Sequence, residues 1–415
     1  MPKTTPFHPR TGPLNETMIW YDWAGYLAAP KYQHSELFEY YAVRNSAGLL
    51  DTSPLFKYRF IGSDAEALLC KALARDIRKC RVGRAQYTIW CNEAGYVVED
   101  GVAMHVAENE YWLTAAEPNL RYFRQIARKL KLDDVQIDDI SESYGILALQ
   151  GPRSLTILNE LTPDVADLRF FRLVETTIAG HSVTVSRTGY TGDLGYELWI
   201  PAESCVDVWD ALMATGRGHN IVPMGMNALK MSRLEAGLLL LDVDFHSARY
   251  AWTDAEQDTP IELGWGWMFK TLAKDDRDFI GRQAIEAELA NRTSRHHIVG
   301  LILDWEDYQR IHREAGINPP MDGVFEEGTF NLYRISDTPW EYAGYATCMI
   351  YSSLLRSHIA LAKLPPDLCT PGTEVDFELQ VIRRSVNVKA RVAELPFFDP
   401  RRKTEKFNEP LKVTQ

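Results

Sequence analysis

The sequence lacks the patterns that mark metal, redox or nucleotide-phosphate sites. None of its six cysteines occurs in a C-x-x-C pair, the spacing typical of zinc and redox sites. No H-x-x-x-H, G-x-S-x-G or P-loop pattern is present, and the adjacent His296 and His297 cannot share one face of a strand. We therefore expect no metal site, and thiols that are reduced and packed as small apolar groups.

Long apolar runs and an excess of basic residues are also missing. No segment approaches the roughly 20 apolar residues needed to span a bilayer, and residues 1–6 contain no apolar core typical of a signal peptide. The 45 Lys and Arg residues against 57 Asp and Glu residues give a net charge of −12. This charge disfavours a nucleic-acid partner, whose phosphates need a basic surface. We expect a cytoplasmic protein with no membrane or nucleic-acid partner.

The chain is long enough for two or three domains, and its composition is that of an ordinary globular protein. It has 415 residues, of which 46% are hydrophobic and 25% charged. Helical and strand patterns mix without strict βαβ alternation, which favours an α+β fold. The clearest are helical patterns at 35–46, 120–131, 205–215 and 225–236 and strand patterns at 85–91, 97–106, 110–115, 145–150 and 182–186.

The C-terminal part differs from the rest because strand patterns dominate it. They lie at 299–303, 343–348, 359–363, 375–381 and 386–392. Residues 1–290 are therefore expected to fold apart from a β-rich domain at 291–415. Residues 305–342 resemble a long polar insertion, and connections of that kind often form lids or surface elaborations.

A glycine-rich turn followed by a strand pattern is the most informative segment. Three glycines and Asp193 crowd residues 188–195, and the strand pattern runs over 196–200. Glycine lets a backbone bend and lets a ligand approach closely. Glu197 lies within the strand, and a carboxylate can accept two parallel hydrogen bonds from a flat ligand edge. Read alone, the segment favours the alternative, a hairpin with Glu197 facing solvent.

Two adjacent acids interrupt the strand pattern at 97–106. Glu99 and Asp100 would point to opposite faces, because side chains alternate along a strand. One of them must therefore face inward or toward a ligand. The alternative is an edge strand, on which charges prevent pairing with another chain. Composition alone favours the edge strand slightly, and the neighbouring Gly101 keeps the ligand interpretation open.

Two further segments carry candidate ligand contacts. On a helix, Arg233 and Glu235 would point about 200° apart, so they would not pair with each other. Arg233 could bind a carboxylate of a ligand. The alternative is that Arg233 and Glu235 are ordinary solvent-exposed charges at the end of a helix. Trp265 and Trp267 alternate with glycines and could line a flat aromatic pocket, although buried tryptophans more often serve a core.

Taken in order, these segments resemble the aminomethyltransferase (glycine cleavage T-protein) family of folate-dependent one-carbon transferases. The similar segments are 42–53, 87–88, 92–93, 95–100, 147–152, 187–197, 233–237, 266–267, 279–281, 299–301, 352–355 and 359–360. The resemblance implies an α+β protein of three domains around a central tetrahydrofolate site. Residues 1–290 would hold two interleaved α+β subdomains, and residues 291–415 a barrel-like domain.

The resemblance also implies roles for single residues. Glu197 would bind the N–H donors of the pterin edge. Asp100 would be the catalytic residue, lying near the folate nitrogen that accepts the carbon, where it would orient the amine and stabilise cationic character during transfer. Arg233 would partner a carboxylate or Glu197. The candidates for contact with tetrahydrofolate are Glu197, Tyr87, Tyr190, Arg233 and Trp267.

The implied activity is transfer of an aminomethyl group to tetrahydrofolate from a small-molecule one-carbon donor, with a lipoyl carrier protein as a candidate partner. Two departures from the family keep alternatives open: Glu99 replaces the first of two paired aspartates, and Leu229-Lys230 replaces Arg-Asp. One alternative is a tetrahydrofolate-dependent demethylase of a methylated amine, methoxy or sulfonium compound. Another is a non-catalytic folate-binding scaffold, whose branch carries a Lys-Gly-Cys-Tyr signature that is absent here.

Overall fold

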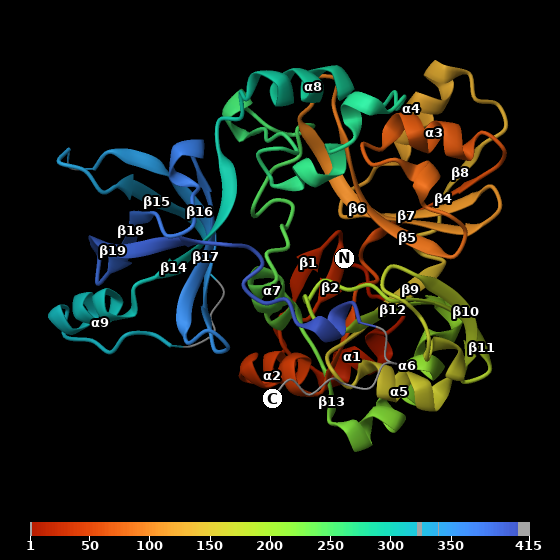
Figure 1. Cartoon of the computed structure of the whole chain (residues 1–415). Helices are drawn as coiled ribbons and strands as arrows, with labels where there is room; N and C mark the ends of the chain where they lie inside the picture. The colour runs from red at the N-terminus through yellow and green to blue at the C-terminus, as the bar shows by residue number, and fades with distance from the viewer. Residues whose placement is uncertain (1, 322–325, 339, 406–415) are drawn as a thin grey trace.

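Two sheets and a closed barrel surround a central helix in the computed structural model (Figure 1), which describes residues 2–321, 326–338 and 340–405. The expected mixture of helices and strands, with a β-rich C-terminal part, is confirmed. Among the described residues, no helix combines the length and apolar character needed to cross a membrane.

The first sheet has six strands and is mostly antiparallel; only β13 pairs in parallel with β3. In spatial order the strands are β10 (Leu173–Ile178), β11 (His181–Ser186), β12 (Gly195–Pro201), β9 (Tyr144–Gln150), β3 (Ala47–Asp51) and β13 (Ile221–Pro223). Its apolar core also includes buried side chains of two helices, α5 (Ser154–Leu161) and α6 (Cys205–Gly216). The short helix α1 (His8–Leu14) packs beside α6.

The second sheet has five antiparallel strands and is inserted in the chain between β3 and β9 of the first. The strands in spatial order are β5 (Arg84–Cys91), β6 (Val97–Ala107), β7 (Glu110–Ala115), β4 (Phe56–Ile61) and β8 (Gln136–Asp139). Helices α3 (Ala65–Ala72) and α4 (Leu120–Leu130) share its apolar core. Strand β6 lies between β5 and β7, but its register with β7 begins at Ala103, so Glu99 and Asp100 pair with β5 alone. The alternative of exposed charges that guard an edge is nevertheless wrong, because Glu99 is fully buried and Asp100 lines a cavity.

Six antiparallel strands form the barrel, which closes by pairing of β14 with β19. In spatial order they are β14 (His297–Leu303), β17 (Ser357–Leu364), β16 (Tyr342–Ser352), β15 (Glu326–Arg334), β18 (Glu374–Val381) and β19 (Arg384–Ala393). The polar insertion expected at 305–342 instead holds helix α9 (Trp305–Glu314) and barrel strand β15, apart from residues 322–325 and 339, which lie outside the description. The sequence reading missed β15 because its residues are largely polar.

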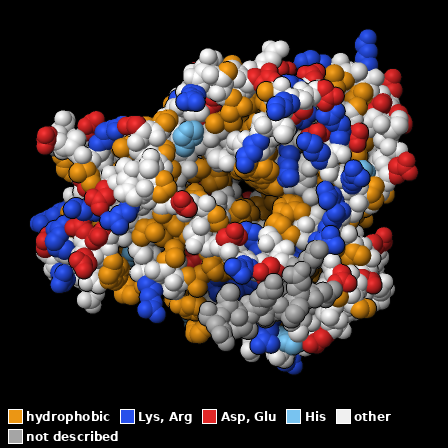
Figure 2. Space-filling model, viewed as in Figure 1, with side chains coloured by type: hydrophobic (Ala, Val, Ile, Leu, Met, Phe, Trp, Pro, Cys, Tyr) orange, Lys and Arg blue, Asp and Glu red, His pale blue; other side chains and the backbone are white. Residues whose placement is uncertain are grey.

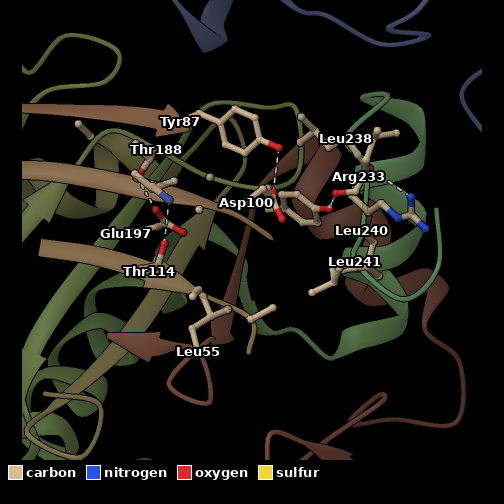
Figure 3. A pocket seen from close by; sticks show the side chains of 18 of the residues that line it. Leu55, Tyr87, Asp100, Thr114, Thr188, Glu197, Arg233, Leu238, Leu240 and Leu241 are labelled. Atoms are coloured by element: carbon tan, nitrogen blue, oxygen red, sulfur yellow. Dashed lines mark hydrogen bonds between the residues drawn. The ribbon is translucent and has the colours of Figure 1, made fainter. Parts of the chain in front are cut away.

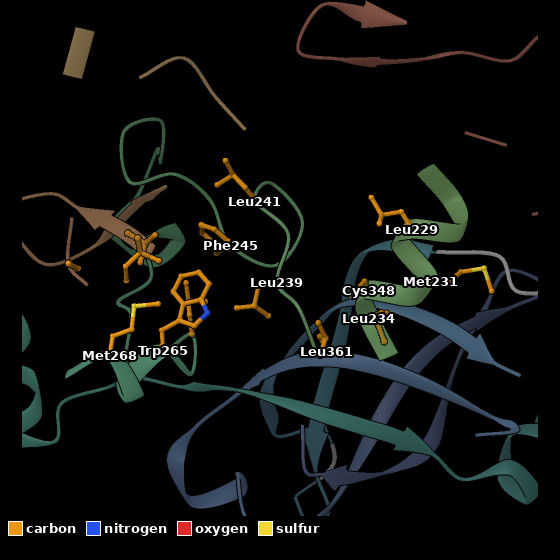
Figure 4. Close-up of a cluster of buried hydrophobic side chains, with 14 of the residues drawn as sticks. Leu229, Met231, Leu234, Leu239, Leu241, Phe245, Trp265, Met268, Cys348 and Leu361 are labelled. Carbon is orange, nitrogen blue, oxygen red and sulfur yellow. The ribbon is translucent and has the colours of Figure 1, made fainter. Parts of the chain in front are cut away.

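Helix α7 (Met226–Glu235) joins the barrel to the first sheet. Its apolar residues pack with Cys348 of β16 and Leu361 of β17 (Figure 4). Its fully buried Glu235 accepts hydrogen bonds from Arg44 of helix α2 (Leu37–Asn45) at 2.7 Å and from Ser352 of β16 at 2.6 Å. The helix is thus fixed to its neighbours by both apolar and charged contacts.

Arg233, the second buried charged side chain of α7, points away from Glu235, as its position predicts. Arg233 forms a buried ion pair with Asp244, and Asp244 also accepts a hydrogen bond from Thr347 of β16 at 2.5 Å. Arg233 and Glu235 therefore have separate partners, and both connections end on the same barrel strand.

Three smaller segments complete the fold. The N-terminal arm contains a hairpin of β1 (Tyr21–Trp23) and β2 (Tyr26–Ala28), and helix α8 (Arg282–Asn291) precedes the barrel. After β19 the chain returns to the first sheet, where Arg402 pairs with Asp193 at 2.6 Å. Arg187 donates hydrogen bonds to backbone carbonyls of residues 402, 403 and 405. The C-terminal segment is thereby held against the glycine-rich turn.

Substitution Glu235→Ala should destabilise the protein by about 3–5 kcal/mol, because it leaves the Arg44 charge buried without its carboxylate. Urea unfolding of the full chain measures the change. The matched control, Glu286→Ala, removes a partly exposed partner of Arg282 and should cost less than about 1 kcal/mol. Equal losses in the two variants would contradict the importance of the buried pair.

Candidate functional site

A cavity of about 1480 Å³ lies where the two sheets, α7 and the barrel meet. This volume exceeds the roughly 300–1,000 Å³ of most ligand pockets, so the cavity has room for a large ligand. Figure 2 shows the hollow, with hydrophobic side chains inside it and Lys and Arg side chains at its border. The first sheet contributes Glu197, the second contributes Tyr87 and Asp100, and the barrel contributes Glu327.

Glu197 lies on β12, an inner strand of the first sheet, and lines the cavity. The Thr188 hydroxyl donates a hydrogen bond to its Oε2 atom (Figure 3). No described residue donates a hydrogen bond to its Oε1 atom, so that oxygen is available to a ligand. Burial raises the pKa of Glu197, and the Thr188 hydrogen bond opposes this change. The solvent-facing hairpin alternative is therefore wrong.

Two glycines of the turn have a role that the sequence does not predict. A Cβ atom on Gly189 or Gly195 would lie 2.0 or 2.2 Å from Oε1 of Gln150. The Gln150 amide fills this space and accepts a 2.9 Å hydrogen bond from the Thr191 hydroxyl. At both positions glycine thus makes room for a buried side chain that shapes the turn. Because both glycines also line the cavity, the expected close approach of a ligand stays a prediction.

Asp100 and Glu99 point to opposite faces of β6, as strand alternation predicts. Asp100 faces the cavity and accepts a 2.8 Å hydrogen bond from the Tyr87 hydroxyl (Figure 3). Glu99 is fully buried on the other face, where it accepts hydrogen bonds from the backbone N–H groups of Ala116 and Glu117.

The two acids differ in charge at neutral pH. Burial raises the pKa of Asp100 to about 6, which the Tyr87 hydrogen bond opposes. Burial raises the pKa of Glu99 to about 9, and the neighbouring charges of Asp100 and Glu117 add to the shift. Glu99 is therefore protonated near pH 7, and Asp100 supplies the negative charge that faces the cavity.

The aromatic candidates all line the cavity. Tyr190 donates a hydrogen bond to the carbonyl of Leu239, and the Tyr87 ring meets Trp265 edge-on at 5.9 Å. Trp267 is 43% exposed, and the guanidinium of Arg75 lies 4.9 Å from the centre of its ring. Their contact with a bound ligand stays a prediction.

Arg233 also borders the cavity, but Glu197 is not its partner. Its buried pair with Asp244 directs the guanidinium toward the barrel side, away from Glu197 (Figure 3). That part of the expectation for Arg233 is wrong, because Asp244 approaches from a loop whose path the sequence does not reveal.

The sequence reading missed two parts of the site. Thr188 holds Glu197, and an apolar wall of Leu238, Leu240 and Leu241 faces the same cavity as Asp100 (Figure 3). Four consecutive leucines directly after Gly237 could have indicated the wall.

One group of potential metal ligands occurs among the described residues, at Asp258, Glu262 and His296. Lys363 lies 2.6 Å from Asp258, and Arg295 lies 2.9 Å from Glu262. Because cationic side chains already neutralise both carboxylates, the group is better described as an ion-pair network between the barrel and the segment that follows α7.

Comparisons with known proteins reveal relatives over most of the chain. The family model described as GCVT N-terminal domain matches residues 14–272. Aminomethyltransferases of Anoxybacillus flavithermus and Bacillus subtilis are each 31% identical over 362 residues, covering 87% of this chain and 89% and 90% of those proteins. The heme-dependent oxidative N-demethylase gamma subunit of Ectopseudomonas mendocina is 30% identical over 387 residues, covering 92% of this chain and 93% of that protein.

A solved structure shares the fold. The crystal structure of glycine cleavage system aminomethyltransferase T from Bartonella henselae matches with a TM-score of 0.79 and 23% identity. The match covers 96% of this chain and 99% of that one, so the arrangement of sheets and barrel is common to both.

Substitution Asp100→Asn should stabilise the protein by about 1–3 kcal/mol at pH 8 and change little at pH 4. The folded-state pKa of about 6 lies above the unfolded value near 3.9, so ionisation costs stability as the pH rises through 6. Urea unfolding at both pH values measures this. The exposed control Asp133→Asn should have no effect at either pH, and a pH-independent effect of Asp100→Asn would contradict the raised pKa.

Proposed function

Because this chain belongs to the aminomethyltransferase (glycine cleavage T-protein) family, we propose that it transfers a one-carbon unit from an amine donor to tetrahydrofolate in the central cavity. The observation that carries the proposal is the pair of carboxylates, Glu197 and Asp100, that two different sheets present to one cavity. Glu197 suits recognition of a flat ligand edge that carries hydrogen-bond donors, and Asp100 suits stabilisation of positive charge.

Glu197 fits the pterin of the cofactor. A pterin presents adjacent N–H donors, and the carboxylate keeps Oε1 free of hydrogen bonds from the described residues while Thr188 orients Oε2. Partial burial strengthens such hydrogen bonds because water competes less for them. Tyr87 and Tyr190, from different sheets, would flank the rings.

Asp100 fits the reacting end. Its carboxylate is ionised above about pH 6 and would stabilise positive charge that develops on the amine during transfer. Tyr87 fixes the orientation of the carboxylate through the 2.8 Å hydrogen bond. The protonated Glu99 behind it adds no second charge, so the site would hold one cationic centre. The leucine wall would limit the access of water.

A second candidate is the folate-dependent step of an amine demethylase that works with partner subunits. The Ectopseudomonas mendocina relative, named as a subunit of an oxidative N-demethylase, matches 92% of this chain, compared with 87% for the two aminomethyltransferases. The departure at Glu99 and the apolar wall of leucines beside Asp100 also favour a donor with methyl groups. A lipoyl carrier protein would be the partner for the first candidate, and an oxidase subunit for the second.

Substitution Glu197→Ala should weaken tetrahydrofolate binding by about 1–3 kcal/mol, because the pterin donors lose their acceptor. Titration calorimetry measures the dissociation constant. The control Glu203→Ala removes an exposed glutamate that does not line the cavity and should bind normally. If Glu197→Ala binds as tightly as the unmodified protein, the pterin assignment is incorrect.

Substitution Asp100→Asn should retain tetrahydrofolate binding and lower turnover about 100-fold or more, because it removes charge stabilisation in the transition state. In the unmodified protein, kcat/KM should fall below about pH 6 as Asp100 is protonated. A turnover screen with a lipoyl-bound aminomethyl group, methylated amines, methoxy compounds and sulfonium compounds would identify the donor. Unchanged turnover of Asp100→Asn would remove this residue from the mechanism.

A further inference from the structure

A fully buried glutamine, Gln150, lies beside the Glu197 carboxylate without reaching the cavity. It is the last residue of β9 and is paired directly with Gly195 of β12. Glu197 follows Gly195 by two residues, so its side chain and that of Gln150 project from the same face of the sheet. Thr188 and Glu197 are among the described residues that line the cavity, and Gln150 is not. Any effect of Gln150 on a ligand therefore acts through its neighbours.

The Gln150 amide connects the two chain segments that carry the contact between Thr188 and Glu197. Its Nε2 atom donates hydrogen bonds to the carbonyl of Thr188 at 3.3 Å and to the carbonyl of Tyr196 at 3.4 Å. The Thr191 hydroxyl donates to Oε1 at 2.9 Å. Turning the amide over would set its oxygen against both carbonyls, so the Thr191 hydrogen bond fixes which way the amide faces.

The Thr188 hydroxyl is the last link between this amide and the carboxylate. A hydroxyl has one proton, and that of Thr188 goes to Oε2 of Glu197. The 2.7 Å hydrogen bond between Ser186 and Thr188 is therefore donated by Ser186. All three side chains of the chain from Ser186 to Glu197 point their donors in one direction, which leaves Oε1 of Glu197 toward the ligand.

The hydrogen bonds of Gln150 can be separated from its volume. The side chain occupies the space beside Gly189 and Gly195, where a Cβ atom would collide with it. An unbranched apolar side chain of similar length, such as methionine, would fill the same space without donating to either carbonyl. A role in packing and a role in orientation therefore predict different results for one substitution.

From this arrangement we infer that Gln150 is a positioning residue for cofactor recognition, which holds Thr188 and β12 so that Oε1 of Glu197 faces the donors of the pterin. The inference rests on the proposed function, because it requires a pterin at Glu197. Its effect should fall on binding and not on transfer, since Asp100 belongs to the other sheet.

The main test is a double-mutant cycle between Gln150→Met and Glu197→Ala, measured by titration calorimetry with tetrahydrofolate. Gln150→Met alone should weaken binding about five- to tenfold, because the carboxylate loses its fixed orientation. In the Glu197→Ala background the same change should weaken binding by less than about twofold, because no carboxylate is left to position. A residue that acts only on folding would give the same loss in both backgrounds.

Turnover provides a second readout. In Gln150→Met the KM for tetrahydrofolate should rise in step with the dissociation constant, while kcat changes by less than about twofold. Thr191→Val removes the hydroxyl that orients the amide and should give the same pattern with a smaller rise. The control Thr176→Val removes a buried hydroxyl of β10 that bonds to Asp164 away from the cavity, and should bind normally.

Equal losses in the two backgrounds would overturn the inference, as would normal binding by Gln150→Met. Failure of the proposed function has a different signature, since Glu197→Ala would then bind tetrahydrofolate as tightly as the unmodified protein, and the inference would fall with it. Thermal unfolding checks that the variants fold. If Gln150→Met does not, Thr191→Val in the same two backgrounds decides by the same comparison.

Discussion

The buried ion pair between Glu235 and Arg44 is the constraint on which the cavity depends. A carboxylate removed from water requires a partner, and here the partners come from α2 and from barrel strand β16. Two residues earlier, Arg233 makes an equivalent connection through Asp244 to Thr347. Because Arg233 and Glu235 point in different directions from one helix, α7 holds the first sheet and the barrel at a set distance. The cavity is the space that this arrangement leaves between them.

Charge is distributed unevenly around that space. The first sheet contributes Glu197, the second sheet presents an ionised Asp100 in front of a protonated Glu99, and Arg75, Arg84 and Arg172 also line the cavity. The proposed ligands fit this distribution of charge, because a flat edge with N–H donors would face Glu197 and a reacting amine would face Asp100. Electrostatic recognition of this kind depends on desolvation, because the same charges on an open surface would be screened by water and salt.

One departure from the aminomethyltransferase pattern lies beside Asp100, at the proposed reacting end. Glu99 occupies the position of the first paired aspartate, and its longer side chain reaches the backbone N–H groups of Ala116 and Glu117 behind the sheet. Four leucines at 238–241 contribute an apolar surface to the wall that faces Asp100. In the proposed binding mode both features lie beside the one-carbon donor and away from the pterin, so we expect them to influence which donor this chain accepts.

Patterns local to the sequence determine most of the secondary structure and the faces on which its side chains lie. Strand alternation placed Glu99 and Asp100 on opposite faces, helical geometry separated Arg233 from Glu235, and most helices and strands lie where their periodicity predicts, because these properties depend on neighbours in the chain. Only the tertiary structure decided that Asp244 partners Arg233, that Gln150 fills the space beside Gly189 and Gly195, that β15 closes the barrel, and that Arg84 meets Arg172. Each of these contacts joins residues distant in sequence, and their pairing follows from how sheets and barrel pack, which no local periodicity encodes.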